Sequence, residues 1–215
     1  ASWPCVACRG RSAPREGGTT ACVVLAQRVP NGGGGDVGVD VVAANAGDSG
    51  AILVPLVPNT RRGASPAALS ALSADSSPPP FVRLTRDHVP DDPREAERLT
   101  RAAARLGRLR RGVTGASVGP TRLYPGGFAT SRAIGDLASP AVICEPECTR
   151  VPLPREGARV LVASDGVWRA VSDETAAKLV AEAADADDAA RTIVRAVVEA
   201  RGVHDDVTAL VAEFP

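Results

Sequence analysis

Apolar residues near the start of the chain come in three short runs, which predicts three β-strands. The first run is TACVVLAQ, Thr20–Gln27, and the others cover residues 40–45 and 51–57. Short runs rich in valine and isoleucine are typical of strands, because a helix needs a longer stretch with helical periodicity. The sequence GDSG at Gly47–Gly50 separates the second run from the third and predicts a tight turn. We therefore expect these three strands to form an antiparallel meander.

A helix is predicted to begin at residue 92. Asp92 is placed to cap it, Pro93 takes the first helical position, and Glu95 completes a capping-box-like pattern. Gly107 is placed to end the helix. Four residues at helical spacing form its apolar face: Ala96, Leu99, Ala103 and Leu106.

The remaining pattern places strands at both ends of the chain and helices between them. Residues 107–136 are rich in glycine and arginine and are expected to form a loop. Strands are predicted at residues 81–84, 159–163 and 207–212, and helices near residues 172–183 and 187–201. Because strands and helices do not alternate regularly, we expect an α+β fold with mostly antiparallel sheets.

Two segments have the composition of irregular chain. Residues 1–16 are rich in glycine, proline, arginine and serine, and they are interpreted as a flexible lead-in. Residues 59–80 repeat proline, serine and alanine, and they are interpreted as a surface insertion of low complexity, because a strand-like run follows at once.

Composition adds little to the choice of function. The chain has 215 residues, 44% of them hydrophobic, and a formal net charge of +0, so no general attraction to nucleic acid or membrane is implied. No apolar run approaches the ~20 residues that cross a bilayer. We expect a single domain and a monomer.

The five cysteines favour a reducing intracellular compartment, such as the cytoplasm, the nucleus or an organelle. Cys22 and Cys144 fall in apolar runs, and the odd count argues against a disulfide framework. A zinc site built from Cys5 and Cys8 together with Cys144 and Cys148 is weakly indicated, because the spacing within the two pairs is its only support.

Aspartates placed at predicted strand ends carry the strongest chemical signal. Asp48 lies in the turn between two strands, Asp165 follows a strand directly, and Asp205 and Asp206 precede the last strand. Carboxylates held at strand ends suit hard divalent cations such as Mg²⁺ or Mn²⁺. For each aspartate alone, a turn-forming or solvated role is the commoner one.

Two other enzyme classes are disfavoured. The GDSG sequence is similar to a serine-protease nucleophile segment, but His88 and His204 both follow Ser49, which is the wrong order for that family. A phosphate-binding P-loop is absent, because the chain contains no Gly-Lys-Ser/Thr.

Six segments together resemble the type 2C metal-dependent protein phosphatases, the PPM family. They occur in that family's order between residues 17 and 213. The segments are GGTTACVVL (17–25), VAANAGDSGAIL (42–53), LTRDHVPDDPREAERL (84–99), ATSRAIGD (129–136), VLVASDGVWRAVSDE (160–174) and HDDVTALV (204–211).

The resemblance implies a sandwich of two antiparallel β-sheets flanked by helices, spanning residues 17–215 with the N-terminal part of the domain missing. It also implies two Mg²⁺ or Mn²⁺ ions that activate a water for attack on phosphorus, without a covalent enzyme intermediate. The expected substrates are proteins phosphorylated on serine or threonine. Neither nucleic acid nor membrane is an expected partner.

Carried over by position, the resemblance gives three metal ligands: Asp165, Asp205 and, for a third and weaker ion, Asp48. No catalytic residue beyond the metal ligands is identified. Residues expected to shape the site are Gly166, Ser131, Arg132, Gly135, Asp136 and Asp206.

The departures from the family pattern keep a second function open. The family's Asp-Gly-His-Gly-Gly segment does not occur in these residues, and Gly50 replaces an arginine. Arg169 stands where the family has an acidic ligand of the third ion, so that site should be weakened by a fixed positive charge. The alternative to a phosphatase is therefore a catalytically inactive relative that binds or regulates phosphoproteins.

Overall fold

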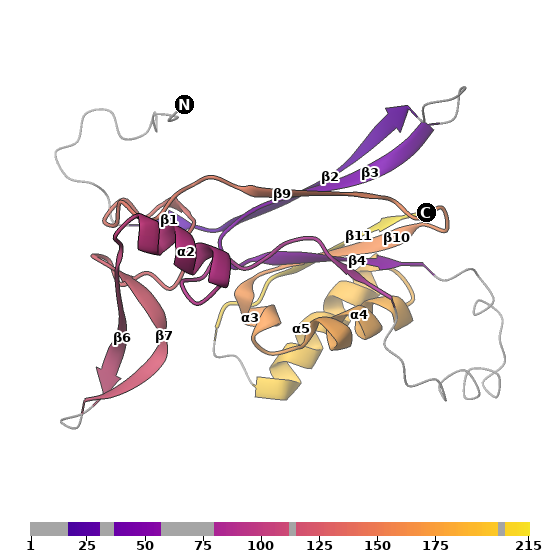
Figure 1. Ribbon diagram of the computed structural model, residues 1–215. Helices are drawn as coiled ribbons and strands as arrows, with labels where there is room; N and C mark the ends of the chain where they lie inside the picture. The colour runs from indigo at the N-terminus through magenta and orange to yellow at the C-terminus, as the bar shows by residue number, and fades with distance from the viewer. Residues whose placement is uncertain (1–16, 31–36, 57–79, 112–114, 202–204) are drawn as a thin grey trace. The chain divides into compact units, whose positions relative to one another are not determined.

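The computed structural model describes residues 17–30, 37–56, 80–111, 115–201 and 205–215 (Figure 1). It contains two compact units. The sandwich unit comprises Cys22–Asn45, Ser49–Arg86 and Glu147–Pro215, and the α2 unit comprises Ala1–Ala21, Ala46–Asp48 and Asp87–Pro146, each as far as its residues are described. The predicted lead-in and most of the predicted insertion at residues 59–80 lie outside the described residues.

The sandwich unit contains two antiparallel sheets. One is four-stranded, in the order β11-β10-β4-β5, and the other is three-stranded, in the order β2-β3-β9. The strands of the first are β4 (Gly50–Pro55), β5 (Val82–Arg83), β10 (Ala158–Ala163) and β11 (Ala209–Phe214). Those of the second are β2 (Ala21–Pro30), β3 (Val37–Ala46) and β9 (Glu147–Pro152), with Ala21 and Ala46 at the boundary of the unit.

Alternating apolar residues join the layers of the sandwich unit. Val41 and Ala43 of β3 form one buried cluster with Leu53 of β4 and Val160 of β10, between the two sheets. The next residues along β4 point to the opposite face, where Ile52 is buried among helical side chains. That face is covered by α3 (Asp165–Trp168), α4 (Asp173–Glu182) and α5 (Ala186–Arg201). The α+β fold with antiparallel sheets and flanking helices is thus confirmed.

The expected meander of the first three strands is right for β2 and β3, which are neighbours in one sheet, but wrong for β3 and β4. β3 pairs with β9, Val42 lying opposite Arg150, whereas β4 pairs with β10, Ala51 lying opposite Val162. The turn at residues 47–49 therefore carries the chain from one sheet to the other instead of closing a hairpin. A tight turn between two apolar runs has the same local sequence in both cases, because the choice depends on strands that come more than 90 residues later.

The α2 unit contains the helix α2 (Pro93–Arg101) and two strand pairs. β1 (Gly18–Thr19) pairs with β8 (Ile134–Gly135), and β6 (Arg105–Arg111) pairs with β7 (Ala116–Tyr124). The β6–β7 ribbon corrects the expectation of a loop over residues 107–136. Arginines alternate with leucines along β6, and Leu109 remains 48% exposed, so the strand has no buried run by which to recognise it.

Helix α2 begins as predicted but ends earlier. Asp92 accepts hydrogen bonds from the backbone N–H groups of Arg94 and Glu95, at 3.0 and 3.1 Å. The backbone N–H of Asp92, which a capping box would pair with Glu95, donates to Val89 O at 3.0 Å, and the Glu95 side chain is buried among other partners. The backbone N–H of Ala104 donates to Leu99 O at 2.9 Å and that of Ala103 to Thr100 O at 3.0 Å, a Schellman motif. The helix therefore ends before Leu106 and Gly107, which lie in β6.

Replacing Ala103 by glycine should raise the free energy of unfolding by about 0.5–1 kcal/mol. Ala103 has φ 50°, a left-handed conformation that costs a residue with a Cβ about 1–2 kcal/mol and glycine almost nothing, although glycine's freer unfolded state offsets part of the gain. Urea denaturation measures the difference. The matched control is Ala96→Gly inside α2, which should lose about 1 kcal/mol. A loss of stability in both variants would show that the left-handed position is not strained.

None of the helices in the described part of the chain has the length and apolar character needed to span a membrane.

Candidate metal centre

Asp165 lies where a buried strand gives way to a short helix. β10 ends at Ala163, Ser164 has extended backbone at φ −71° and ψ 165°, and α3 begins at Asp165. The indole N–H of Trp168 donates to Ala163 O at 3.0 Å and holds this turn of helix against the strand end. The carboxylate of Asp165 is thus attached to stiff backbone, as its position in the sequence predicted.

The segment before β11 is fastened to the same turn. Ser164 Oγ donates to Asp206 O at 3.1 Å and accepts from the backbone N–H of Thr208 at 3.0 Å. The backbone N–H of Ser164 donates to Thr208 O at 3.0 Å. A Cβ on Gly166 would lie 2.4 Å from Asp206 O, so only glycine permits this close approach. The close approach of Gly166 to the backbone of Asp206 therefore brings Asp205 beside α3.

Asp165 and Asp205 share one cationic partner, Arg169. The guanidinium of Arg169 donates from Nη2 to Asp165 Oδ2 at 2.8 Å and from Nη1 to Asp205 Oδ2 at 3.2 Å. The backbone N–H of Asp206 donates to the other oxygen, Oδ1, of Asp205 at 3.0 Å. Two carboxylates from segments 40 residues apart thus converge on one positive charge. The two are 28% and 52% exposed, and Arg169 is 53% exposed.

The carboxylate pair fits part of the implied metal chemistry. Mg²⁺ is held in many proteins by one or two carboxylates together with water and substrate oxygens, and the donor set of Asp165 and Asp205 is of that kind. Over the described ranges, no group of three or more His, Cys, Asp or Glu side chains is placed to hold a metal. A two-ion centre does not follow from these residues.

Asp48, predicted to bind a third ion, belongs to the α2 unit and is largely buried, with 8% of its surface exposed. The preceding residue, Gly47, has φ 120°, and its N–H donates to Nδ1 of His88 at 3.2 Å. The backbone N–H of His88 returns a bond to Gly47 O at 2.9 Å, and the His88 ring is fully buried. His88 therefore fixes the turn that carries Asp48.

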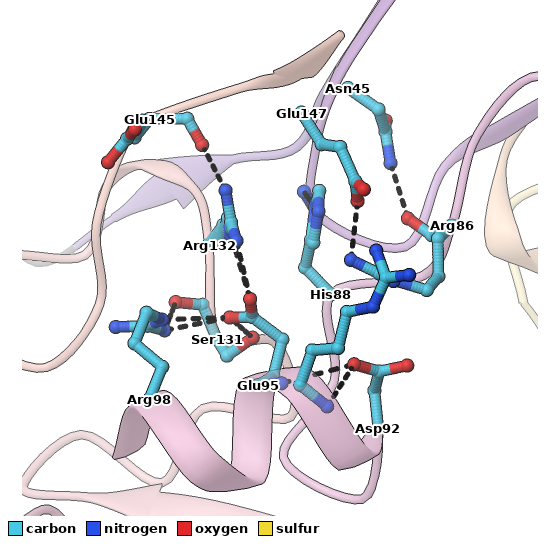
Figure 2. A network of polar contacts seen from close by, with 12 residues as sticks. Asn45, Arg86, His88, Asp92, Glu95, Arg98, Ser131, Arg132, Glu145 and Glu147 are labelled. Atoms are coloured by element: carbon cyan, nitrogen blue, oxygen red, sulfur yellow. Dashed lines mark hydrogen bonds and ion pairs between the residues drawn. The ribbon is translucent and has the colours of Figure 1, made fainter. Parts of the chain in front are cut away.

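Ser131 and Arg132 converge on Glu95 instead of facing an open site (Figure 2). Arg132 contacts Glu95 Oε1 at 2.6 Å, and Ser131 Oγ donates to Oε2 at 2.7 Å. Nη2 of Arg98 donates to Oε2 at 2.8 Å and to the carbonyl oxygen of Ser131 at 2.9 Å, and Nη1 donates to the carbonyl oxygen of Ala141 at 2.9 Å. Ser131 and Arg132 thus belong to a buried network that ties α2 to residues 131–141, and their expected site-shaping role stays a prediction.

Burial alone would raise the pKa of Glu95. The hydrogen bonds from Arg132, Ser131 and Arg98 and the charge of Arg98 outweigh it and lower the pKa to about 2. Glu95 is therefore an ionised structural group near neutrality. Sequence reasoning missed this role of Glu95. Its partner Arg98 lies only three residues away, but Ser131 and Arg132 lie 36–37 residues away along the chain, so the local sequence gives no signal for the network.

Gly135 and Asp136 shape the β1–β8 pair. Gly135 has φ 100°, and a Cβ there would lie 2.5 Å from Gly17 O. Asp136 has φ 52°, and its carboxylate lies against Gly18. A Cβ at position 18 would lie 2.4 Å from Cγ of Asp136. Burial raises the pKa of Asp136. The geometry gives both residues a backbone-positioning role in the α2 unit.

Asn45 and Gly50, which lie on either side of the turn at residues 47–49, each make a close contact in the sandwich unit. Asn45 Nδ2 donates to Arg86 O at 3.1 Å, and the Arg86 guanidinium pairs with Glu147 at 2.8 Å, so three strand ends are linked (Figure 2). At Gly50, a Cβ would lie 2.5 Å from Nη2 of Arg83, whose guanidinium is 4.4 Å from the centre of the Trp168 ring. The space beside Gly50 is therefore filled by an arginine from another strand.

The three cysteines of the described ranges are free thiols, and none belongs to a group of metal-binding side chains there. Burial raises the pKa of Cys22 to about 11, with the charge of Arg83 acting in the opposite direction, so its thiol is a poor ligand and nucleophile near neutrality. Cys144 and Cys148 are exposed free thiols, and Cys144 lies outside the strands. Cys5, Cys8 and His204 lie outside the described residues.

The family model and the curated relatives that match the chain all carry the same family description. A family model described as Protein phosphatase 2C matches residues 7–207. "Probable protein phosphatase 2C 3" of Oryza sativa subsp. japonica is 38% identical over 133 residues, which are 61% of this chain and 27% of the rice protein. "Probable protein phosphatase 2C 15" of Arabidopsis thaliana is 40% identical over 125 residues, which are 57% of this chain and 28% of that protein. The chain thus spans less than a third of these curated relatives.

Among solved structures, a serine-threonine phosphatase 2C from Toxoplasma gondii superposes with a TM-score of 0.60 at 19% identity, over 83% of this chain and 57% of that one. A Caenorhabditis elegans sex-determining protein gives a TM-score of 0.58 at 23% identity, over 83% of this chain and 40% of that one. Likeness at this level of identity shows the fold.

Proposed function

Because the chain belongs to the protein phosphatase 2C family, we propose that it acts as a metal-dependent protein phosphatase on phosphoserine and phosphothreonine. The observation that carries the proposal is the convergence of Asp165 and Asp205 on one cationic group, at 2.8 and 3.2 Å. Both carboxylates lie at ends of neighbouring strands, because Ala163 of β10 is paired with Ala209 of β11. The fold thus supplies a rigid, negatively charged edge.

Asp165 and Asp205 are the proposed ligands of one Mg²⁺ or Mn²⁺ ion, and Asp48 remains a proposed ligand of a further ion. A bound divalent ion supplies two effects in phosphoryl transfer: it lowers the pKa of coordinated water and stabilises charge on the phosphoryl oxygens. The contribution of the chain itself is to position the carboxylates. Ser164 sets the separation of Asp165 from the 205–206 segment through its hydrogen bonds at 3.0–3.1 Å, and Gly166 permits the close approach because it has no Cβ.

The proposed substrates are phosphorylated proteins, and the proposed state is a monomer. A second function, binding of phosphoproteins without turnover, is favoured by one specific observation. The positive charge between the two carboxylates is already provided by Arg169. If a metal ion never displaces the Arg169 guanidinium, the chain keeps its fold but binds no metal at Asp165 and Asp205.

Phosphopeptide hydrolysis distinguishes the two functions. The chain should release phosphate from phosphothreonine and phosphoserine peptides in Mn²⁺, at least tenfold faster than from the matched phosphotyrosine peptide, and should release none in EDTA. Phosphate release is measured colorimetrically, and peptide binding is measured in parallel by fluorescence anisotropy. Binding of the phosphopeptides with no release in Mn²⁺ would overturn the phosphatase proposal in favour of the binding function.

A further inference from the structure

We propose that Arg169 is a built-in cation that competes with divalent metal for the carboxylate pair of Asp165 and Asp205. This inference rests on the proposed metal site, and it concerns the residue that controls loading of that site. The sequence placed Arg169 beside a third, weaker ion. The structure shows it across both carboxylates, with one nitrogen on each.

The chemistry of the guanidinium suits it to this role. Arginine stays protonated in proteins, and its planar fork of N–H donors matches carboxylate oxygens better than a point charge does. Nη2 and Nη1 of Arg169 reach Oδ2 of Asp165 and Oδ2 of Asp205, so one oxygen of each proposed metal ligand is already occupied. A divalent ion on these oxygens would lie within a few ångströms of the guanidinium and would be repelled by it.

The surroundings make the guanidinium the movable part. The Asp205 segment is held to Ser164 by three hydrogen bonds of 3.0–3.1 Å. Gly166 and Asp206 O are so close that the segment cannot move nearer to α3. Asp165 begins α3, and the backbone N–H of Arg169 bonds to Asp165 O at 2.9 Å, which keeps the two residues one turn apart. The side chain of Arg169 is 53% exposed, so it has solvent into which to swing.

Half-exposed charges are screened by water, so the competition is moderate. An opposing charge at such a position changes binding by about tenfold rather than by many orders of magnitude. An ordinary surface ion pair, by contrast, has no bearing on metal affinity. The chain contains such a pair for comparison: Arg191 and Asp187 of α5 also lie four residues apart at 2.8 Å, and both are more than 70% exposed.

Mn²⁺ binding by the 215-residue chain tests the proposal, with isothermal titration calorimetry as the readout. Arg169→Ala and Arg169→Gln should each bind Mn²⁺ about tenfold more tightly than the wild type. Arg169→Lys, which retains the charge, should stay within about threefold of the wild type, and Arg191→Ala should be unchanged. Circular dichroism establishes that each variant is folded, and the rise in Tm on adding Mn²⁺ gives a second readout that should be larger in the two neutral variants.

Equal or weaker Mn²⁺ binding in folded Arg169→Ala and Arg169→Gln would overturn the proposal. The test is separate from the test of the phosphatase function, because it does not depend on turnover. Tighter Mn²⁺ binding without phosphate release would uphold the role of Arg169 and contradict the proposed activity.

Discussion

Replacing Glu95 by alanine should lower the free energy of unfolding by about 3–5 kcal/mol. The Glu95 side chain is 1% exposed and pairs with Arg132 at 2.6 Å and with Arg98 at 2.8 Å. Removing one member of a buried ion-pair network leaves the remaining charges without compensation, and losses of about this size follow. Urea denaturation followed by circular dichroism measures the change.

The matched control for this substitution lies on the same helix. Glu97→Ala removes a carboxylate that is 72% exposed and pairs with Arg101 at 3.5 Å, so it should change stability by less than about 0.5 kcal/mol. Similar small losses in both variants would show that the Glu95 network does not stabilise the fold.

The pH dependence of stability gives a second readout of Glu95. Its pKa is lowered from the usual 4.5 to about 2 in the folded chain, so the ionised form favours folding. The stabilisation is fully present above pH 4.5 and is lost as the pH falls toward 2, by about 3 kcal/mol in total. Glu95→Gln should therefore lose less stability than the wild type between pH 5 and pH 2.

Replacing Asp165 by asparagine should reduce Mn²⁺-dependent phosphate release at least 100-fold. The change keeps the shape of the side chain but removes the negative charge that faces the cationic position, where Asp165 Oδ2 now contacts Arg169 at 2.8 Å. Loss of a ligand charge weakens metal binding directly, whereas changes in supporting groups alone cost about 10–100-fold. Initial rates on a phosphothreonine peptide measure the effect.

An exposed aspartate elsewhere provides the control for Asp165→Asn. Asp187 is 72% exposed and pairs only with a neighbour on its own helix in the contacts described above, so Asp187→Asn should leave the rate unchanged. A rate for Asp165→Asn within threefold of the wild type would remove Asp165 from the site while leaving the fold intact.

Local sequence patterns predicted the elements that bury apolar side chains at a regular period. The run at residues 159–163 became β10, buried at nearly every position, and the helices near residues 172–183 and 187–201 became α4 and α5. Ser172 caps α4 by accepting from the backbone N–H of Thr175. These elements were predictable because the interactions that define them lie within a few residues of one another.

Features that depend on distant residues were not predictable in the same way. β9 was missed because charged and polar residues, among them Arg150, interrupt its apolar pattern. The strand with which β9 pairs, β3, lies more than 100 residues earlier in the chain. The end of α2 was placed too late because Ala103 is a good helix former, although the chain there turns left-handed. The four-residue spacing of Asp165 and Arg169 is visible in the sequence, but the contact of Arg169 with Asp205 arises only when β10 pairs with β11.

One titration shows whether the carboxylates of Asp165 and Asp205 form the cation site of a phosphatase. The rate of phosphate release from a phosphothreonine peptide is followed as Mn²⁺ is added to the folded 215-residue chain, with Asp165→Asn beside it. We expect the rate to rise from zero in EDTA to a plateau in the wild type and to stay near zero in the variant. A rate independent of Mn²⁺, or none at any concentration, would contradict this expectation.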